Sequence, residues 1–96
     1  MRFDRLSFSG HATVRMFERR IRTEDVRQVL ATGEVIADYP GDTPYPSCLI
    51  LGWITGHPLH VVAALDSGSR TCYVITVYAP DPGQWSADFR TRRTTR

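Results

Sequence analysis

The chain has 96 residues, of which 42% are hydrophobic and 23% are charged, enough for one domain around a single core. No stretch approaches the ~20 apolar residues that a membrane-spanning helix needs, and the start lacks the apolar run of a signal peptide, so we expect a cytoplasmic protein with no membrane partner. The net charge of +2 is uneven: seven arginines oppose four acidic residues in 1–33, one opposes six in 34–88, and four stand unopposed in 89–96.

Residues 1–8 are expected to be a lead-in whose apolar side chains pack against a first helix. The apolar pattern predicts that helix over 11–21, capped by Ser9 or Gly10 and ending near Arg20. At 3.6 residues per turn it carries two apolar stripes, one of Val14, Phe17 and Ile21 and one of Ala12 and Met16.

The same helix carries a basic row formed by His11, Arg15 and Arg19, at positions i, i+4 and i+8. A row of this kind is usually a solvated basic face, and the pattern alone favours that interpretation. Because the row is bordered by apolar residues, it could instead rim a groove that holds a phosphate. The second interpretation predicts that the three side chains line one surface cleft.

Thr23 predicts the cap of a second helix, with carboxylates in its first turn and Gly33 as its stop. Four strands should follow, over 35–39, 47–54, 59–65 and 71–79, separated by turns at 40–46, 55–58 and 66–70. We therefore expect an α+β domain, with two N-terminal helices packed on a four-stranded, mainly antiparallel sheet.

After the last strand, 84–89 should form a turn of helix that docks Trp85 and Phe89 back onto the domain. The single domain is expected to span 1–90, and 91–96 to be a disordered basic tail. The arginines of this region, Arg90, Arg92, Arg93 and Arg96, should add affinity for nucleic acid or for an acidic partner through their charge.

Polar side chains in the predicted strands could join the basic row. Alternation along the last strand places Thr76 and Tyr78 on one face, together with Cys72 and Val74. Each of these residues, like His60 in the strand before, is ordinary in a strand. Taken with the basic row, however, they supply what RNA cleavage without a metal requires: a base for the 2′-OH, guanidiniums for the phosphorane and an acid for the leaving oxygen.

The sequence predicts no metal site and no cofactor. His57 and His60 could be imagined as a metal pair, but no acidic residue or cysteine lies nearby in sequence to complete a site. Cys48 and Cys72 lie in separate apolar runs without a CxxC spacing, which favours buried free thiols over a disulfide.

These motifs together resemble the domain-of-unknown-function 4258 family over nearly the whole chain. The resembling segments are Ser9-Gly10-His11-Ala12, Arg15-Met16, Arg19, Ile21, Glu24-Asp25-Val26, Gly33-Glu34-Val35-Ile36, Tyr39-Pro40, Pro44-Tyr45-Pro46-Ser47, Pro58-Leu59-His60-Val61-Val62, Ile75-Thr76-Val77-Tyr78, Pro80-Asp81-Pro82, Trp85 and Asp88-Phe89-Arg90-Thr91-Arg92. One departure is Arg20, where relatives commonly have glycine before the isoleucine.

The resemblance implies a fold of the barnase, EndoU, colicin and RelE-like nucleases, and a toxin-like endoribonuclease, a hydrolase of a bacterial toxin–antitoxin pair. The implied partners are RNA, including mRNA on the ribosome, and a cognate antitoxin of the zinc-finger type. On this reading the catalytic residues are His11, Arg15, Arg19 and Tyr78, and the substrate-binding residues are His60, Thr76, Arg90 and Arg92. The alternative is a non-catalytic module that uses the same fold to bind RNA or protein.

Overall fold

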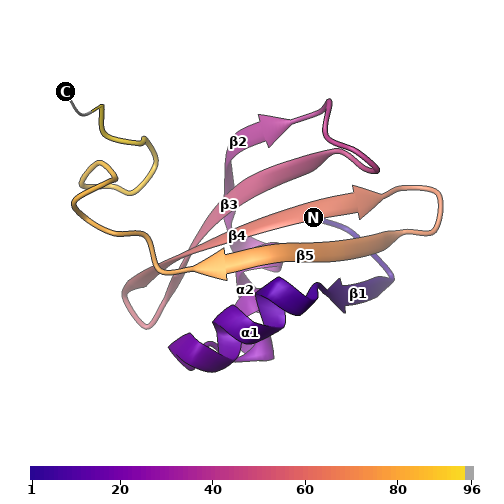
Figure 1. Ribbon diagram of the computed structural model, residues 1–96, viewed down its shortest axis with the longest axis horizontal. Coiled ribbons are helices and arrows are strands. Elements are labelled where there is room, and N and C mark those ends of the chain that lie inside the picture. The colour runs from indigo at the N-terminus through magenta and orange to yellow at the C-terminus, as the bar shows by residue number, and fades with distance from the viewer. Residues whose placement is uncertain (95–96) are drawn as a thin grey trace.

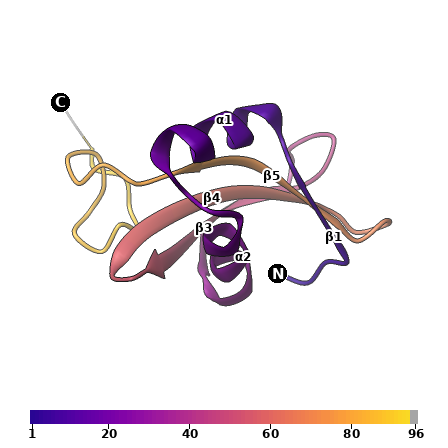
Figure 2. The same cartoon turned by 90° about the horizontal axis from the view of Figure 1, so that it is seen from below.

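The computed structural model describes residues 1–94, which form an α+β domain with both helices on one face of a five-stranded sheet (Figure 1). The elements are β1 (Arg5–Phe8), α1 (Gly10–Arg19), α2 (Thr23–Thr32), β2 (Glu34–Tyr39), β3 (Ser47–Ile54), β4 (His57–Asp66) and β5 (Thr71–Tyr78). The strand order is β1-β5-β4-β3-β2. Seen from below in Figure 2, α1 runs along β5 and α2 crosses near β3. We call the opposite side of the sheet its open face.

The prediction of four strands is wrong. The sheet has five, because part of the expected lead-in pairs with the last strand. β1 lies parallel to β5, from Arg5 opposite Thr71 to Phe8 opposite Val74. Its apolar residues pack against the core, as expected of the lead-in. Four residues are too few for alternation to distinguish a strand from an extended lead-in. The sheet is therefore mixed, with β1–β5 as its parallel pair and the other three pairs antiparallel.

The first helix begins and ends where the sequence predicts. Ser9 is its N-cap, with a side-chain oxygen that accepts a hydrogen bond from the Ala12 amide at 3.0 Å. Arg20 ends the helix in the left-handed conformation, at φ 56° and ψ 39°. Glycine adopts this conformation at the least cost, which accounts for the glycine expected here from the resemblance, and Arg20 adopts it without that advantage.

The N-cap of the second helix lies one residue earlier than predicted. Arg22 is its N-cap, and Thr23 is the first helical residue. The reason is Asp25, whose carboxylate accepts both the Arg22 amide and the Arg22 guanidinium, each at 3.1 Å. A carboxylate at this position satisfies a free amide of the first turn and complements the helix dipole.

The β3–β4 turn is shorter than predicted. Thr55 and Gly56, both with positive φ, make a two-residue connection, so His57 and Pro58 belong to β4. His57 thus stands at the first position of a strand, opposite Ile54, instead of within a loop. The other predicted strands and turns are confirmed to within two residues.

A bulge in β5 changes which residues share a face of the sheet. Val62 lies opposite Thr76, but the next residue of β4, Ala63, lies opposite Val74, so Ile75 is the extra residue. Strict alternation, which put Thr76 and Tyr78 with Cys72 and Val74, was therefore wrong. Cys72 and Val74 lie in the core beside the helices, whereas the residues opposite Val62 and His60 lie on the open face.

The core lies between the helices and the sheet and leaves no room for a side chain at Gly52. A Cβ at this position would lie 2.5 Å from Val29 Cγ2, and Val29 is buried. We predict that Gly52→Ala lowers the free energy of unfolding by about 1–3 kcal/mol, since overpacking forces side chains out of their rotamers. Denaturant unfolding measures this, with Gly41→Ala as the control, because nothing lies within 4 Å of its added Cβ. Equal stability of the two variants would contradict the prediction.

The segment after β5 docks on the domain but is not helical. Turns occupy the predicted helical stretch, and Trp85 forms an isolated bridge with Arg92. Trp85 is buried, as predicted, and Arg93 donates from Nε to the Trp85 carbonyl at 2.7 Å. The segment expected as a tail therefore contacts the domain as far as Arg93, and its last residues, 95–96, lie outside the described part of the chain. Within residues 1–94, no helix is both long and apolar enough to cross a membrane.

Candidate functional site

The basic row lies on the solvent side of α1. Ala12 and Met16 turn the other side of the helix into the core, which leaves His11, Arg15 and Arg19 exposed. At a rise of 1.5 Å per residue the row spans about 12 Å. A single small group cannot contact both of its ends, but an extended chain of charges can.

Charge along the row is only weakly neutralised. Arg15 lies 3.7 Å from Glu18, and both side chains are about half exposed, so this ion pair contributes little stability. Within residues 1–94 no ion pair involves Arg19 or its neighbour Arg20. The end of α1 therefore carries two guanidiniums available to an anion.

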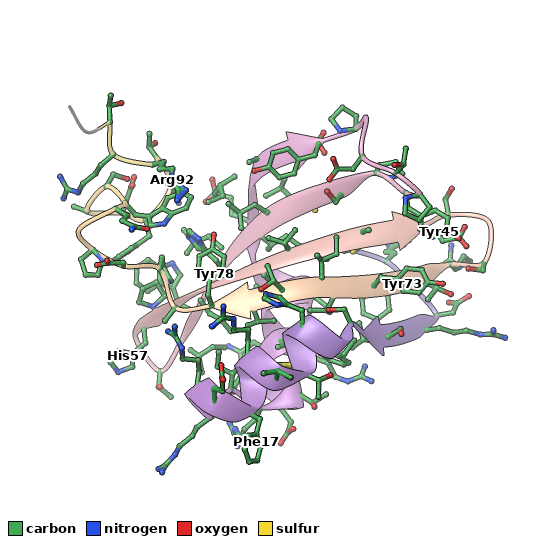
Figure 3. All side chains as sticks on the ribbon, in the orientation of Figure 1. Phe17, Tyr45, His57, Tyr73, Tyr78 and Arg92 are labelled. Carbon is green, nitrogen blue, oxygen red and sulfur yellow. The ribbon has the colours of Figure 1, made fainter. Side chains whose placement is uncertain are left out.

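The row ends in a pocket of about 340 Å³, where the end of α1, the start of α2, the β3–β4 turn and the end of β5 meet. Its lining includes four charged or titratable side chains, Arg19, Arg20, His57 and Asp25, above an apolar floor that includes Ile54 and Leu59. The Asp25 carboxylate is already paired with the Arg22 guanidinium at 3.1 Å. Figure 3 shows His57 at the tip of the β3–β4 hairpin, close to the end of α1. We call this the hairpin pocket. An imidazole and two guanidiniums in one pocket can bind a phosphodiester and move a proton beside it.

A second group of predicted residues meets on the open face, but it is closed to substrate. His60 is fully buried, with Nε2 2.9 Å from the Phe89 carbonyl and Nδ1 3.2 Å from the Tyr78 hydroxyl. A carbonyl only accepts, so Nε2 carries the proton and Nδ1 accepts from Tyr78. Trp85 packs edge-on over the imidazole, with ring centroids 4.5 Å apart. The ring thus joins the C-terminal segment to the sheet.

The pKa values in this cluster agree with a neutral, structural role. Burial lowers the pKa of His60, an effect only partly opposed by its hydrogen bond to Phe89. Burial also raises the pKa of the Tyr78 phenol, although the nearby Arg92 acts in the opposite direction. Both side chains are therefore uncharged near neutral pH.

Because the pKa of His60 is lowered in the folded state, we predict a loss of stability in mild acid. Below about pH 6.5 the unfolded chain takes up the proton first, so the free energy of unfolding falls as the pH drops from 7 toward the folded pKa. Urea unfolding at pH 7, 6 and 5 should show this fall in the wild type and a smaller one in His60→Gln. Carboxylates with lowered pKa values, such as Asp25 and Asp88, lose their contribution only in stronger acid. Parallel curves for the two proteins would contradict the assignment.

The remaining predicted binding residues already have partners within the domain. Arg90 forms an ion pair with Glu34 at 2.6 Å, and Arg92 lies over the Trp85 ring at 5.5 Å from its centroid. Thr76 lies opposite Val62 on the open face, half-buried. Arg90 thus joins the C-terminal segment to β2, and Arg92 packs within that segment, so the charge of both is only partly available to a ligand.

Neither cysteine is prepared for nucleophilic chemistry. Both thiols are free and buried, and burial raises the pKa of each, that of Cys72 to about 11. Within the described residues, no three side chains of the metal-binding types cluster together.

The structure divides the predicted residues into two groups. Arg19 reaches the hairpin pocket, with His11 and Arg15 behind it on the same helix, while His60 and Tyr78 meet on the open face. Sequence reasoning considered His57 only as a metal ligand. The signal that could have found it is Thr55-Gly56, which can form a two-residue turn and so places His57 at the tip of a hairpin.

A family model described as "Domain of unknown function (DUF4258)" matches residues 8–79. That range includes the basic row and every residue of the hairpin pocket, and it ends before the C-terminal segment. No curated protein and no solved structure matches the chain.

Proposed function

The chain belongs to the family described as domain of unknown function 4258, and we propose that it is an endoribonuclease that cleaves RNA with its own side chains and without a metal ion. The observation that carries the proposal is the hairpin pocket, where Arg19, Arg20 and His57 share one lining. The basic row of α1 leads into this pocket and would hold the neighbouring phosphates of the strand. The chemistry of the pocket and the family resemblance point to the same substrate.

The reaction is transesterification within the RNA strand. The neutral imidazole of His57 accepts the proton of the ribose 2′-OH, and the 2′ oxygen attacks the adjacent phosphorus. Arg19 and Arg20 stabilise the additional negative charge on the phosphorane. The bond to the 5′ oxygen then breaks, and this oxygen takes a proton from water at the open mouth of the pocket. The protonated His57 returns its proton to the hydroxide that forms, which restores the free imidazole. The products are a 2′,3′-cyclic phosphate and a 5′-hydroxyl.

Some of the catalytic roles proposed here fall to residues other than those predicted from the sequence. His57 replaces His11 as the proton-transfer group, because it shares the pocket with two guanidiniums. His11 and Arg15 guide the strand along α1. Tyr78 positions His60, to which its hydroxyl donates, and is not assigned a proton transfer to substrate.

The family resemblance extends the proposal to the biological setting. The order of two helices before an antiparallel meander agrees with the barnase, EndoU, colicin and RelE-like group. The protein would then act as the toxin of a toxin–antitoxin pair, on RNA that includes ribosome-bound mRNA, in the cytoplasm. A zinc-finger antitoxin would be its partner.

The test is cleavage of a short single-stranded RNA in the presence of EDTA, with analysis of the product ends. The proposal expects a 2′,3′-cyclic phosphate, and no cleavage of the same sequence as DNA, which lacks the 2′-OH. Absence of cleavage both alone and with translating ribosomes would remove the enzymatic proposal.

A second candidate function is protein binding without catalysis, and one observation favours it. Phe17 is 87% exposed on α1, next to Val14, so most of the predicted first apolar stripe faces solvent. An open groove lies beside it, lined by Met16, Phe17, Glu18, Arg20, Ile21 and Arg22. Its apolar centre and basic rim suit a partner segment with an apolar anchor and acidic flanks. Partner binding lost in Phe17→Ser, with no cleavage by the wild type, would favour this candidate.

A further inference from the structure

A cleft on the open face has no role in the function proposed above. It encloses about 360 Å³ and is lined by the β2–β3 loop, Ala64 of β4 and two residues at the bulge of β5, Tyr73 and Ile75. Tyr45 and Tyr73 stack in parallel, with ring centroids 5.6 Å apart and 2° between their planes. Figure 3 shows them together at the end of the sheet opposite His57. We call this the tyrosine cleft.

The loop that forms one wall of the cleft is fixed to the sheet. Its Asp42 carboxylate accepts a hydrogen bond from the Ser47 hydroxyl, and the Pro46 carbonyl accepts the Leu65 amide at 3.1 Å. The negative charge of Asp66 raises the pKa of Tyr45, so the phenol remains neutral. The stacked rings are therefore held in position before any ligand binds.

We propose that the tyrosine cleft binds a nucleobase of the RNA strand, which rests on the function proposed above. A flat aromatic wall is what a base stacks on, and the remaining apolar lining includes Pro44 and Ile75. Asp42 places a carboxylate at the edge of the cleft, where it can accept a hydrogen bond from a base amino group. A phosphate would be repelled by this carboxylate and by the nearby Asp66, so the cleft suits the base and not the backbone.

The first residue of the basic row lies close in the chain to a residue that contacts the cleft. The Ser9 hydroxyl, at the cap of α1, donates to the carbonyl of Ile75 at 2.7 Å, and Ile75 lines the tyrosine cleft. His11 lies two residues beyond this contact. At the far end of the row, Ala79 lines the hairpin pocket, about 13 Å along β5 from Ile75. Because the cleft is on the open face and the pocket is on the helix side, an oligonucleotide that occupies both must cross the edge of β5 beyond β1, which pairs only with residues 71–74.

The experiment measures binding of uncleavable probes to the full chain. Four 2′-O-methyl tetranucleotides differ only in the base under test, which is A, C, G or U, and a fifth carries an abasic residue at that position. The affinity of each probe is measured by fluorescence anisotropy. Uracil lacks an amino group, so its probe and the abasic probe should bind more weakly than the others. Tyr45→Leu should weaken the best probe by about 5- to 150-fold, the usual range for one base stacked on an aromatic ring. It should leave the abasic probe unchanged.

Two further variants complete the test. Asp42→Asn retains an acceptor for Ser47 and should reduce the difference between the probes. Tyr39→Leu removes an exposed tyrosine that does not line the cleft and should bind like the wild type. Equal affinity for all five probes, or a Tyr45→Leu variant that retains the wild-type preference, would overturn the proposal. Because the probes cannot be cleaved, absence of RNA cleavage does not affect this result.

Discussion

Replacing His57 with alanine is expected to slow RNA cleavage by about a hundred- to ten-thousand-fold, the usual loss when a general acid–base group is removed. The residue stands at the start of β4 and lines the hairpin pocket with Arg19 and Arg20. Its side chain is exposed and packs into no core, so its loss should leave the fold intact. The measurement is the single-turnover rate on a short RNA, after thermal unfolding has shown that the variant is as stable as the wild type.

The matched control is His11→Ala, which removes the other exposed imidazole of the same surface. Because His11 lies about 12 Å from Arg19 along α1, we expect this variant to bind RNA more weakly and to cleave bound RNA at close to the wild-type rate. If His11→Ala instead lost the chemical step and His57→Ala retained it, the basic row itself would be the catalytic site. Arg19→Lys should retain only part of the activity in either case, since an ammonium cannot replace a bidentate guanidinium.

The second large effect concerns the buried imidazole of the open face. We predict that His60→Ala lowers the free energy of unfolding by about 2–5 kcal/mol. The substitution leaves the Tyr78 hydroxyl and the Phe89 carbonyl without their partner and opens a cavity beneath Trp85. Denaturant unfolding at pH 7 measures the loss, and the fluorescence of Trp85 reports whether the C-terminal segment is released.

Tyr78→Phe distinguishes this structural role from a catalytic one. It removes only the hydroxyl, so it should cost about 1 kcal/mol of stability and leave the cleavage rate of the folded protein unchanged. A loss of cleavage of a hundredfold or more in a folded Tyr78→Phe variant would show that the phenol takes part in the reaction. The assignment of His60 and Tyr78 as a structural pair would then be wrong.

Local patterns predicted much of the fold. Ser9 is a good helix cap, Gly33 ends the second helix, and the apolar runs of β3, β4 and β5 are long enough to be recognised. The parts that were missed depend on partners distant in sequence. β1 is a strand because β5 offers an edge to it, and the bulge at Ile75 appears only when β5 is aligned with β4.

The candidate site shows the same division. Helical periodicity was sufficient to place His11, Arg15 and Arg19 in one row. It could not show that Arg19 shares a pocket with His57, because 38 positions of sequence and three intervening elements, α2, β2 and β3, separate them. Nor could it show that His60 is enclosed by Trp85, since that depends on where the C-terminal segment folds back. Tyr45 and Tyr73 likewise meet only in the folded sheet.

The most direct test of the account is the single-turnover cleavage of one short RNA by the wild type and by His57→Ala, in EDTA, with the product ends identified. We predict that the wild type produces a 2′,3′-cyclic phosphate and a 5′-hydroxyl. We also predict that His57→Ala, equally folded, does so at least a hundredfold more slowly. Cleavage at the same rate by both proteins would contradict the assignment of the hairpin pocket as the catalytic site.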